Sequence, residues 1–185
     1  MIAVDVNPAN LAMAKKLGAH EIIQIESRRL KGVGTPTEAS GKTKDYESDP
    51  KVIEKIMELT YGKGVDVSME MAGPFSSINN AIDATRRGGD VILFGLKDGD
   101  LTIPKFSRVI VRGLTIHNII GRRIFRTWQI AQRVLSDKTN GIQDAIWNVI
   151  LKKGKGTILR FQDFTPKKFE KAMSENPKIL FKING

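Results

Sequence analysis

The sequence predicts an α/β fold in which a parallel sheet is covered by helices on both faces. Short runs of β-branched residues alternate with amphipathic stretches of helical length, and Gly or Pro residues lie between them. The distance from one strand-like run to the next leaves room for a helix, which is typical of parallel strands. A chain of 185 residues is long enough to bury a core and fits one ordinary domain.

The first elements are predicted from an apolar run and a helix start. Residues 2–6 form a strand-like run, and the Asn7-Pro8 pair after it predicts a helix over residues 8–17. Residues 21–25 are rich in isoleucine, which predicts a second short strand.

Regular structure stops and then resumes in the next part of the chain. Residues 27–49 are polar and show no period, so we expect a surface insertion there. Asp49-Pro50 is a typical helix start, and apolar residues at helical spacing follow it. A strand over residues 65–71 and a helix over residues 74–87 come next.

The remaining elements repeat the alternation. The predicted strands are residues 90–94, 101–103 (a short additional strand), 114–119, 157–161 and 178–183. The predicted helices are residues 125–136, 142–151 and 166–175.

Composition excludes several classes of protein and of site. The chain has no Cys and only two His, which rules out disulfides and thiolate metal ligands and disfavours a histidine-rich metal site. No apolar run approaches the ~20 residues of a membrane span, and the N-terminus does not have the pattern of a signal peptide. We therefore expect a soluble cytoplasmic protein with no membrane partner.

The charge is distributed unevenly along the chain. Residues 1–100 carry 13 Lys/Arg and 15 Asp/Glu, whereas residues 101–185 carry 17 and 5. A basic half raises nucleic acid as a partner. The basic residues are nevertheless dispersed among apolar ones, and aromatic residues make up only 6% of the chain, so no stacking surface is evident. We expect a solvated basic surface and no nucleic-acid partner.

Three stretches, taken in order, carry a family resemblance. They are VDVNPANLAMAKKLGA, then GVDVSMEMAG with RRGGDVILFGL, and finally GLTIHNIIGRRIFRTW. Together they resemble the ribose-binding strand and the fourth to sixth strands of zinc-containing medium-chain alcohol dehydrogenases. The G-R-x-x-F-x-T-W ending is most similar to the L-threonine 3-dehydrogenase branch. The resemblance implies a Rossmann-like doubly wound parallel sheet, an NAD cofactor and oxidation of a secondary alcohol.

The resemblance also implies a set of residues that contact NAD. Asp5 would accept the adenosine ribose hydroxyls and favour NAD over NADP, whose additional phosphate it repels. Asn10 stands where threonine dehydrogenases carry an Arg near the adenosine, which weakens one charged contact. Arg122 would hold a pyrophosphate or a substrate carboxylate. The other implied positions, all at strand ends, are Ala72, Gly73, Phe94, Gly95, Leu96, Ile119 and Ile120.

Several of these residues also have a purely structural interpretation. Asp5 could cap a helix, Gly73 could serve only as a turn glycine, residues 119–120 could belong to the core, and Arg122 could be solvated. His117 lies within an apolar strand, so we expect a structural histidine whose ring nitrogens are hydrogen-bonded.

Parts of the family's pattern are missing. Its first strand and its G-x-G-x-x-G turn would lie before Met1, and so would the N-terminal domain whose Cys, His and Glu ligands hold zinc. We therefore expect residues 1–185 to be an incomplete Rossmann-like domain with a C-terminal extension. We expect it to be a fragment or the product of a split reading frame, inactive on its own.

The missing first strand is central in the strand order 3-2-1-4-5-6. Exposing several buried Val, Ile or Leu side chains, each worth about 1.5–3 kcal/mol, would remove much of a domain's stability of about 5–15 kcal/mol. Three arrangements would fill the position. The opening strand could pair with residues 65–71, a second copy could donate a strand in a homo-oligomer, or a complementing polypeptide could supply it.

Two functions from different classes follow from the sequence. The chain is the NAD-binding portion of a zinc-dependent dehydrogenase, or it is a non-catalytic binding or oligomerisation module that keeps the fold without affinity for the cofactor.

Overall fold

The computed structural model describes residues 1–26, 46–96 and 99–183, which form two compact units. Residues 23–121 form the first unit, which we call the sheet unit. Residues 1–22 together with residues 122–185 form the second, which we call the terminal unit. Most of the expected surface insertion, residues 27–45, falls outside the described residues.

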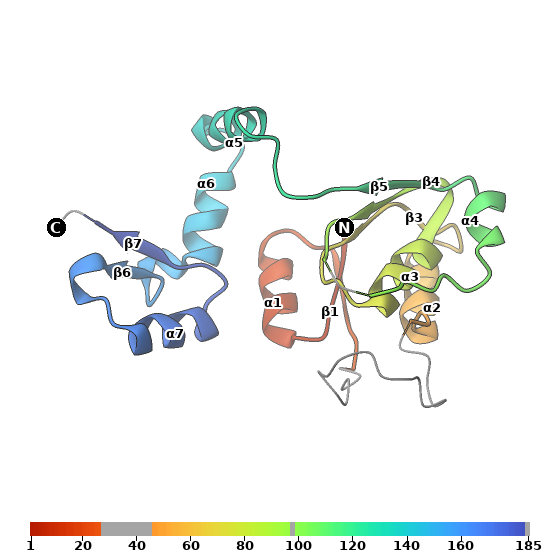
Figure 1. Ribbon diagram of the computed structural model, residues 1–185, viewed down its shortest axis with the longest axis horizontal. Coiled ribbons are helices and arrows are strands. Elements are labelled where there is room, and N and C mark those ends of the chain that lie inside the picture. Colours follow the sequence, from red (N-terminus) through yellow and green to blue (C-terminus); the bar gives the residue numbers. More distant parts are fainter. Residues whose placement is uncertain (27–45, 97–98, 184–185) are drawn as a thin grey trace. The chain divides into compact units, whose positions relative to one another are not determined.

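Three parallel strands form the sheet of the sheet unit (Figure 1). They lie in the order β3 (Val65–Glu70), β4 (Thr85–Leu93) and β5 (Thr115–Asn118), so each strand pairs with the next one along the chain. Met69 is paired with Ile92, and Ile92 with His117, which aligns the carboxyl ends of the strands. The predicted parallel α/β arrangement is confirmed for these strands.

α2 (Pro50–Leu59) precedes β3, whereas α3 (Phe75–Ala84) connects β3 to β4 and α4 (Ser107–Val111) connects β4 to β5. Figure 1 shows α2 and α3 on the same side of the sheet. The buried core of the unit joins Ile78 and Ile82 of α3 to Val91 of β4 and Val109 of α4. Each fully buried aliphatic side chain contributes about 1.5–3 kcal/mol, so this cluster fixes α3 against the sheet.

The end of α3 differs from the sequence prediction. The helix ends at Ala84, and the prediction that it extends to Arg87 is wrong. Thr85 instead begins β4, and its hydroxyl lies 2.7 Å from the hydroxyl of Ser68 on β3. The Arg112 guanidinium donates hydrogen bonds to the last carbonyl groups of the helix. Partners distant in sequence therefore end α3, and a local pattern does not reveal them.

The predicted short strand at residues 101–103 is also wrong, because this segment pairs with no strand of the described residues. The Thr102 carbonyl instead accepts a hydrogen bond of 2.9 Å from the side-chain amide of Asn79. The same amide donates to the Tyr46 carbonyl at 2.6 Å, and Asn79 is fully buried. One buried side chain of α3 thus holds two loops.

The last residues of the expected insertion are held against α3. Ser48 Oγ donates to Asp83 at 2.6 Å, and the Asp49 amide donates to Asn80 Oδ1 at 2.6 Å. Asp83 also forms an ion pair of 2.7 Å with Arg108. Asp49 then serves as the N-cap of α2, as the sequence predicts.

The N-terminal elements follow the prediction. β1 (Ile2–Asp5) leads into α1 (Pro8–Lys16), and β2 (Glu21–Gln24) comes after the helix. Asn7 caps α1 by accepting a hydrogen bond of 2.8 Å from the Ala9 amide. β1 pairs with β2 in a two-stranded sheet.

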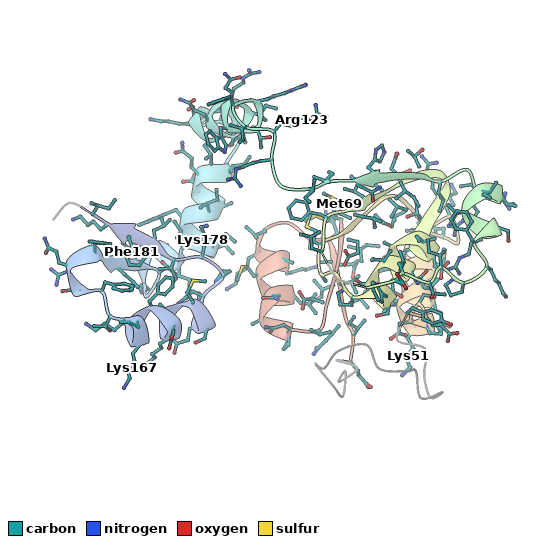
Figure 2. The ribbon with its side chains drawn as sticks, viewed as in Figure 1. Lys51, Met69, Arg123, Lys167, Lys178 and Phe181 are labelled. Atoms are coloured by element: carbon teal, nitrogen blue, oxygen red, sulfur yellow. The ribbon has the colours of Figure 1, made fainter. Side chains whose placement is uncertain are left out.

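The C-terminal part of the terminal unit contains a further parallel pair, β6 (Ile158–Arg160) with β7 (Leu180–Lys182). The ring of Phe181 on β7 stacks on Phe169, with centroids 5.7 Å apart. Phe169 lies on α7 (Pro166–Glu175), and Figure 2 shows Lys167 on the side of this helix that faces away from Phe181. Among the described residues, no helix is long and apolar enough to cross a membrane. The helices and strands of this C-terminal part are, in order, α5 (Arg126–Ser136), α6 (Ile142–Ala145), the π-helical η1 (Ile146–Ile150), η2 (Lys152–Gly154), β6 (Ile158–Arg160), η3 (Phe161–Asp163), α7 (Pro166–Glu175) and β7 (Leu180–Lys182).

Candidate functional site

An apolar hollow of about 370 Å³ lies at the carboxyl ends of β3, β4 and β5. Parallel sheets bind ligands at this end, because loops of variable sequence leave the strands there. The structure brings together five of the residues that the resemblance implies. The lining residues are Met71, Phe94, Gly95, Leu96, Ile119, Ile120 and Gly121.

Two glycines allow the turns beside this hollow to approach one another. A Cβ atom at Gly95 would overlap the Gly73 amide nitrogen, and a Cβ atom at Gly73 would lie 2.7 Å from the Leu96 carbonyl oxygen. Gly73 also has a φ of +96°, a conformation that favours glycine. Ala72 and Gly73 therefore lie next to the hollow, and no larger residue fits at position 73 or 95 unless the turns move apart.

The site contains one residue that the sequence pattern does not single out. Glu70, the last residue of β3, is only 4% exposed, and its carboxylate accepts hydrogen bonds from the Ala72 and Gly73 amides at 2.8 and 2.7 Å. A signal for it exists in VDVSMEM, where a period of two places the polar Ser68 and Glu70 on one face of an otherwise apolar strand.

Asp5 and Asn10 contact each other at the start of α1. Asn10 Nδ2 donates to Asp5 Oδ2 at 3.0 Å, and the Asn7 amide donates to Asp5 Oδ1 at 2.7 Å. Asp5 is the last residue of β1 and half-buried. Its carboxylate therefore lies at a strand end with its orientation fixed by two neighbours.

Arg122 is placed by an aromatic ring. Its guanidinium carbon lies 5.9 Å from the ring centroid of Trp128 on α5, within the range of a cation–π interaction. Arg122, Asp5 and Asn10 all belong to the terminal unit, whereas the hollow belongs to the sheet unit. That these three residues and the hollow bind the same cofactor stays a prediction.

A larger and more polar groove of about 580 Å³ lies within the terminal unit. Asn10, Lys16, Lys152 and Asn176 are among the residues that line it. The Lys152 ammonium donates to Asn176 Oδ1 at 2.7 Å, so part of this polar lining is already paired within the protein. The apolar hollow at the strand ends is the better match for a planar ring.

The described residues do not fit a zinc site. The sequence has no Cys, and its two histidines, His20 and His117, belong to different units. His117 Nε2 lies 2.8 Å from Asp90 Oδ1, so one ring nitrogen is bonded as expected, while the ring itself is half exposed. No group of three His, Cys, Asp or Glu that could hold a metal occurs in the described part of the chain.

Charged groups at the amino end of the sheet form structural contacts. Arg86 donates to Asp66 at 2.5 Å, and this hydrogen bond holds the pKa of the Asp66 carboxyl below its ordinary value. Burial lowers the pKa of Arg112, whose guanidinium bonds to the end of α3. These residues lie at the opposite end of the strands from the hollow and are engaged there, so we assign them no ligand.

Curated relatives match the greater part of this chain. The L-threonine 3-dehydrogenase of Pyrococcus horikoshii is 33% identical over 132 residues, and that of Shewanella woodyi is 31% identical over 128 residues. These matches cover 70% and 69% of this chain but only 37% and 31% of those relatives. The chain therefore spans about a third of their length.

Solved structures share the fold. The 2R,3R-butanediol dehydrogenase from Bacillus subtilis matches with a TM-score of 0.59 at 21% identity, over 99% of this chain and 43% of that one. An alcohol dehydrogenase zinc-binding domain protein from Burkholderia ambifaria matches with a TM-score of 0.60 at 19% identity, over 100% and 42%. At these identities the likeness shows the Rossmann-like fold alone.

A family model described as zinc-binding dehydrogenase matches residues 1–137. This range contains β1 to β5, the apolar hollow and every residue that the resemblance implies for cofactor binding. The chain belongs to the zinc-binding dehydrogenase family.

Proposed function

We propose that this chain is the NAD-binding portion of a zinc-dependent medium-chain dehydrogenase that oxidises a secondary alcohol and is similar to L-threonine 3-dehydrogenase. The observation that carries the proposal is the apolar hollow at the carboxyl ends of three parallel strands. Bound NAD supplies the hydride acceptor. The residues of this chain bind and orient it.

The hollow suits the nicotinamide end of the cofactor. Phe94 and Leu96 provide apolar surface that excludes water, and Gly95 allows the ligand to approach the backbone because it has no side chain. Residues 119–120 contribute further apolar surface from the end of β5. Ala72 and Gly73 border this position through their contact with the turn after β4.

Asp5 and Asn10 are proposed to bind the adenosine ribose. A carboxylate accepts about four hydrogen bonds, so Asp5 retains capacity for the two ribose hydroxyls beside its bonds to Asn7 and Asn10. Its negative charge would repel the additional phosphate of NADP, which is why we propose NAD. Arg122 supplies a cation for the pyrophosphate or for a substrate carboxylate.

The zinc and the substrate contacts are proposed to come from residues outside this sequence. The described residues do not fit zinc, and the chain spans about a third of the length of the curated relatives it matches. We therefore expect the chain to be inactive towards L-threonine on its own.

A complementing polypeptide or a second copy is proposed to pair with β3. Within the sheet unit, β3 pairs only with β4 among the described strands, so its other edge has no partner strand in that unit. On one face of β3, Val67 and Met69 are 47% and 59% exposed, which is costly for large apolar side chains. A strand and its helix, supplied from elsewhere, would cover both features.

The second candidate function is a non-catalytic binding or oligomerisation module. The observation that favours it is α5, which has no buried residue and exposes about half of the Trp128 and Ile130 side chains. An amphipathic helix of this kind is a common protein-binding surface. Under this alternative the fold is kept and the cofactor is not bound.

Calorimetric titration of the purified chain with NADH separates the two functions. We expect saturable binding that Asp5→Ala weakens by about tenfold or more, since charge-assisted hydrogen bonds to the ribose are lost. Asp66→Ala is the matched control. It also removes an aspartate from a strand, but Asp66 is exposed and lies near the start of β3, at the end of the strand away from the hollow. A folded chain that binds no NADH would contradict the proposal and favour the module.

A further inference from the structure

Glu70 connects both turns that form the hollow through its backbone and its side chain. Its backbone carbonyl accepts hydrogen bonds from the Phe94 and Gly95 amides, at 2.9 and 3.2 Å, beyond the end of β4. Its Oε1 atom accepts bonds from the Ala72 and Gly73 amides in the turn that leads to α3. Glu70 does not line the hollow itself, but it is hydrogen-bonded to both of these turns.

The same carboxylate oxygen also reaches the first turn of α3. Ser77 Oγ donates to Glu70 Oε1 at 2.6 Å, so three donors converge on one oxygen atom. Three hydrogen bonds to one fixed acceptor restrict the turn more strongly than any single bond would. The position of Gly73 relative to β3 is thereby defined.

The second oxygen of this carboxylate, Oε2, is in a different environment. Glu70 Oε2 is buried and has no hydrogen-bond partner in the described residues. It lies beneath Gly95, since a Cβ atom there would be 2.6 Å from it. An unpaired buried carboxylate oxygen lowers stability, so a residue chosen only to stabilise the empty fold would avoid it.

We propose that Glu70 is a positioning residue for the dinucleotide. Its carboxylate holds the Ala72–Gly73 turn against Gly95 and so sets the width of the hollow between the ends of β3 and β4. The ligand in this inference rests on the proposed function, whereas the role of Glu70 in holding the turn does not.

Two substitutions of similar size separate this role from simple packing. Glu70→Gln keeps one oxygen for the three donors, whereas Glu70→Met fills similar volume without an acceptor. We expect amide hydrogen exchange at Ala72 and Gly73 to be about tenfold faster in E70M and nearly unchanged in E70Q. The Phe94 amide bonds to the backbone carbonyl of residue 70, so its exchange serves as an internal control.

NADH affinity should follow the same order. We expect a Kd within about threefold of wild type for E70Q and at least about tenfold weaker for E70M. Ser77→Ala is the matched control, since it removes one of the three donors and should change the Kd by less than E70M does. If E70M does not fold, Glu70→Asp, which withdraws the carboxylate by one methylene, takes its place.

Amide exchange and NADH affinity in these variants test the proposal. Wild-type exchange and affinity in E70M would overturn the proposal, as would equal losses in E70Q and E70M. A wild-type chain that does not bind NADH would instead overturn the proposed function and with it the ligand named here. The exchange measurement would then still decide whether Glu70 holds the turn.

Discussion

The side-chain amide of Asn10 donates a hydrogen bond of 3.0 Å to Asp5 Oδ2. The bond joins the end of β1 to the first turn of α1, and the Asn7 amide donates to the other carboxylate oxygen. Asp5 is thus oriented by neutral donors, and no cation neutralises it in these contacts. A carboxylate in this state is well suited to accept hydroxyl groups.

Asn10→Ala should weaken NADH binding by about two- to tenfold, the effect of losing one neutral hydrogen bond of about 0.5–1.5 kcal/mol that orients Asp5. The smaller effect than that of Asp5→Ala is the diagnostic feature, because Asn10 acts through the carboxylate. Calorimetric titration of both variants measures it. Identical losses in the two variants would contradict this order.

Gly95→Ala should destabilise the chain by about 2 kcal/mol or more. The new methyl group would overlap the Gly73 amide and lie 2.6 Å from Glu70 Oε2, so the two turns must separate. Gly113→Ala is the control. Its Cβ meets nothing within 4 Å, but its φ of +60° imposes a cost of about 1–2 kcal/mol. Urea denaturation compares the two, and a smaller loss at position 95 would refute the close approach.

Asn79→Ala should lower the free energy of unfolding by about 1–3 kcal/mol, because the substitution leaves buried polar groups unpaired. The Asn79 amide holds the Tyr46 and Thr102 carbonyls on two separate loops. Asn80→Ala, which removes one acceptor from the partly exposed neighbour, should cost less. Thermal denaturation of the three proteins ranks them, and equal midpoints for the two variants would contradict the assignment.

The Asp66–Arg86 pair should make stability depend on acid pH. The bond from Arg86 lowers the pKa of Asp66 in the folded state, so the ionised carboxylate favours folding. This contribution is present above the ordinary aspartate pKa of about 3.9 and is lost as the pH falls through the lower folded value. Wild type should therefore exceed Asp66→Asn in stability at pH 6 and converge with it as the pH falls through the lowered folded pKa of Asp66.

Salt provides the control for this pair, which is largely exposed. Raising the ionic strength to about 1 M shortens the Debye length to about 3 Å and should reduce the difference between the two proteins at pH 6. A difference that is independent of both salt and pH would show that the ion pair is not its source.

The sequence predicts the elements whose signals are local. Three helices begin at an Asx-Pro or Thr-Pro pair, and each pair predicts a capped N-terminus. In the structure the side chains of Asn7, Asp49 and Thr165 accept hydrogen bonds from nearby backbone amides. The strands that lead to the hollow were also predicted, because each is a short apolar run bounded by glycine.

Contacts between residues distant in sequence determine the features that local patterns do not predict. α3 ends at Ala84 because Thr85 bonds to Ser68 and Arg112 bonds to the end of the helix. Residues 101–103 lie beside Asn79 instead of forming a strand. The role of Glu70 is likewise not evident from the local sequence. Its role depends on the register of β3 against β4, which brings Gly73 and Gly95 together.

We propose that the strand ends of the sheet unit bind a dinucleotide, and backbone amide NMR during titration with NADH tests this binding at individual residues. We predict saturable shift changes at Gly73, Gly95 and Gly121, beside the hollow, and none at Gly64 and Gly113. Changes at all five glycines alike, or at none of them in a folded chain, would contradict the account.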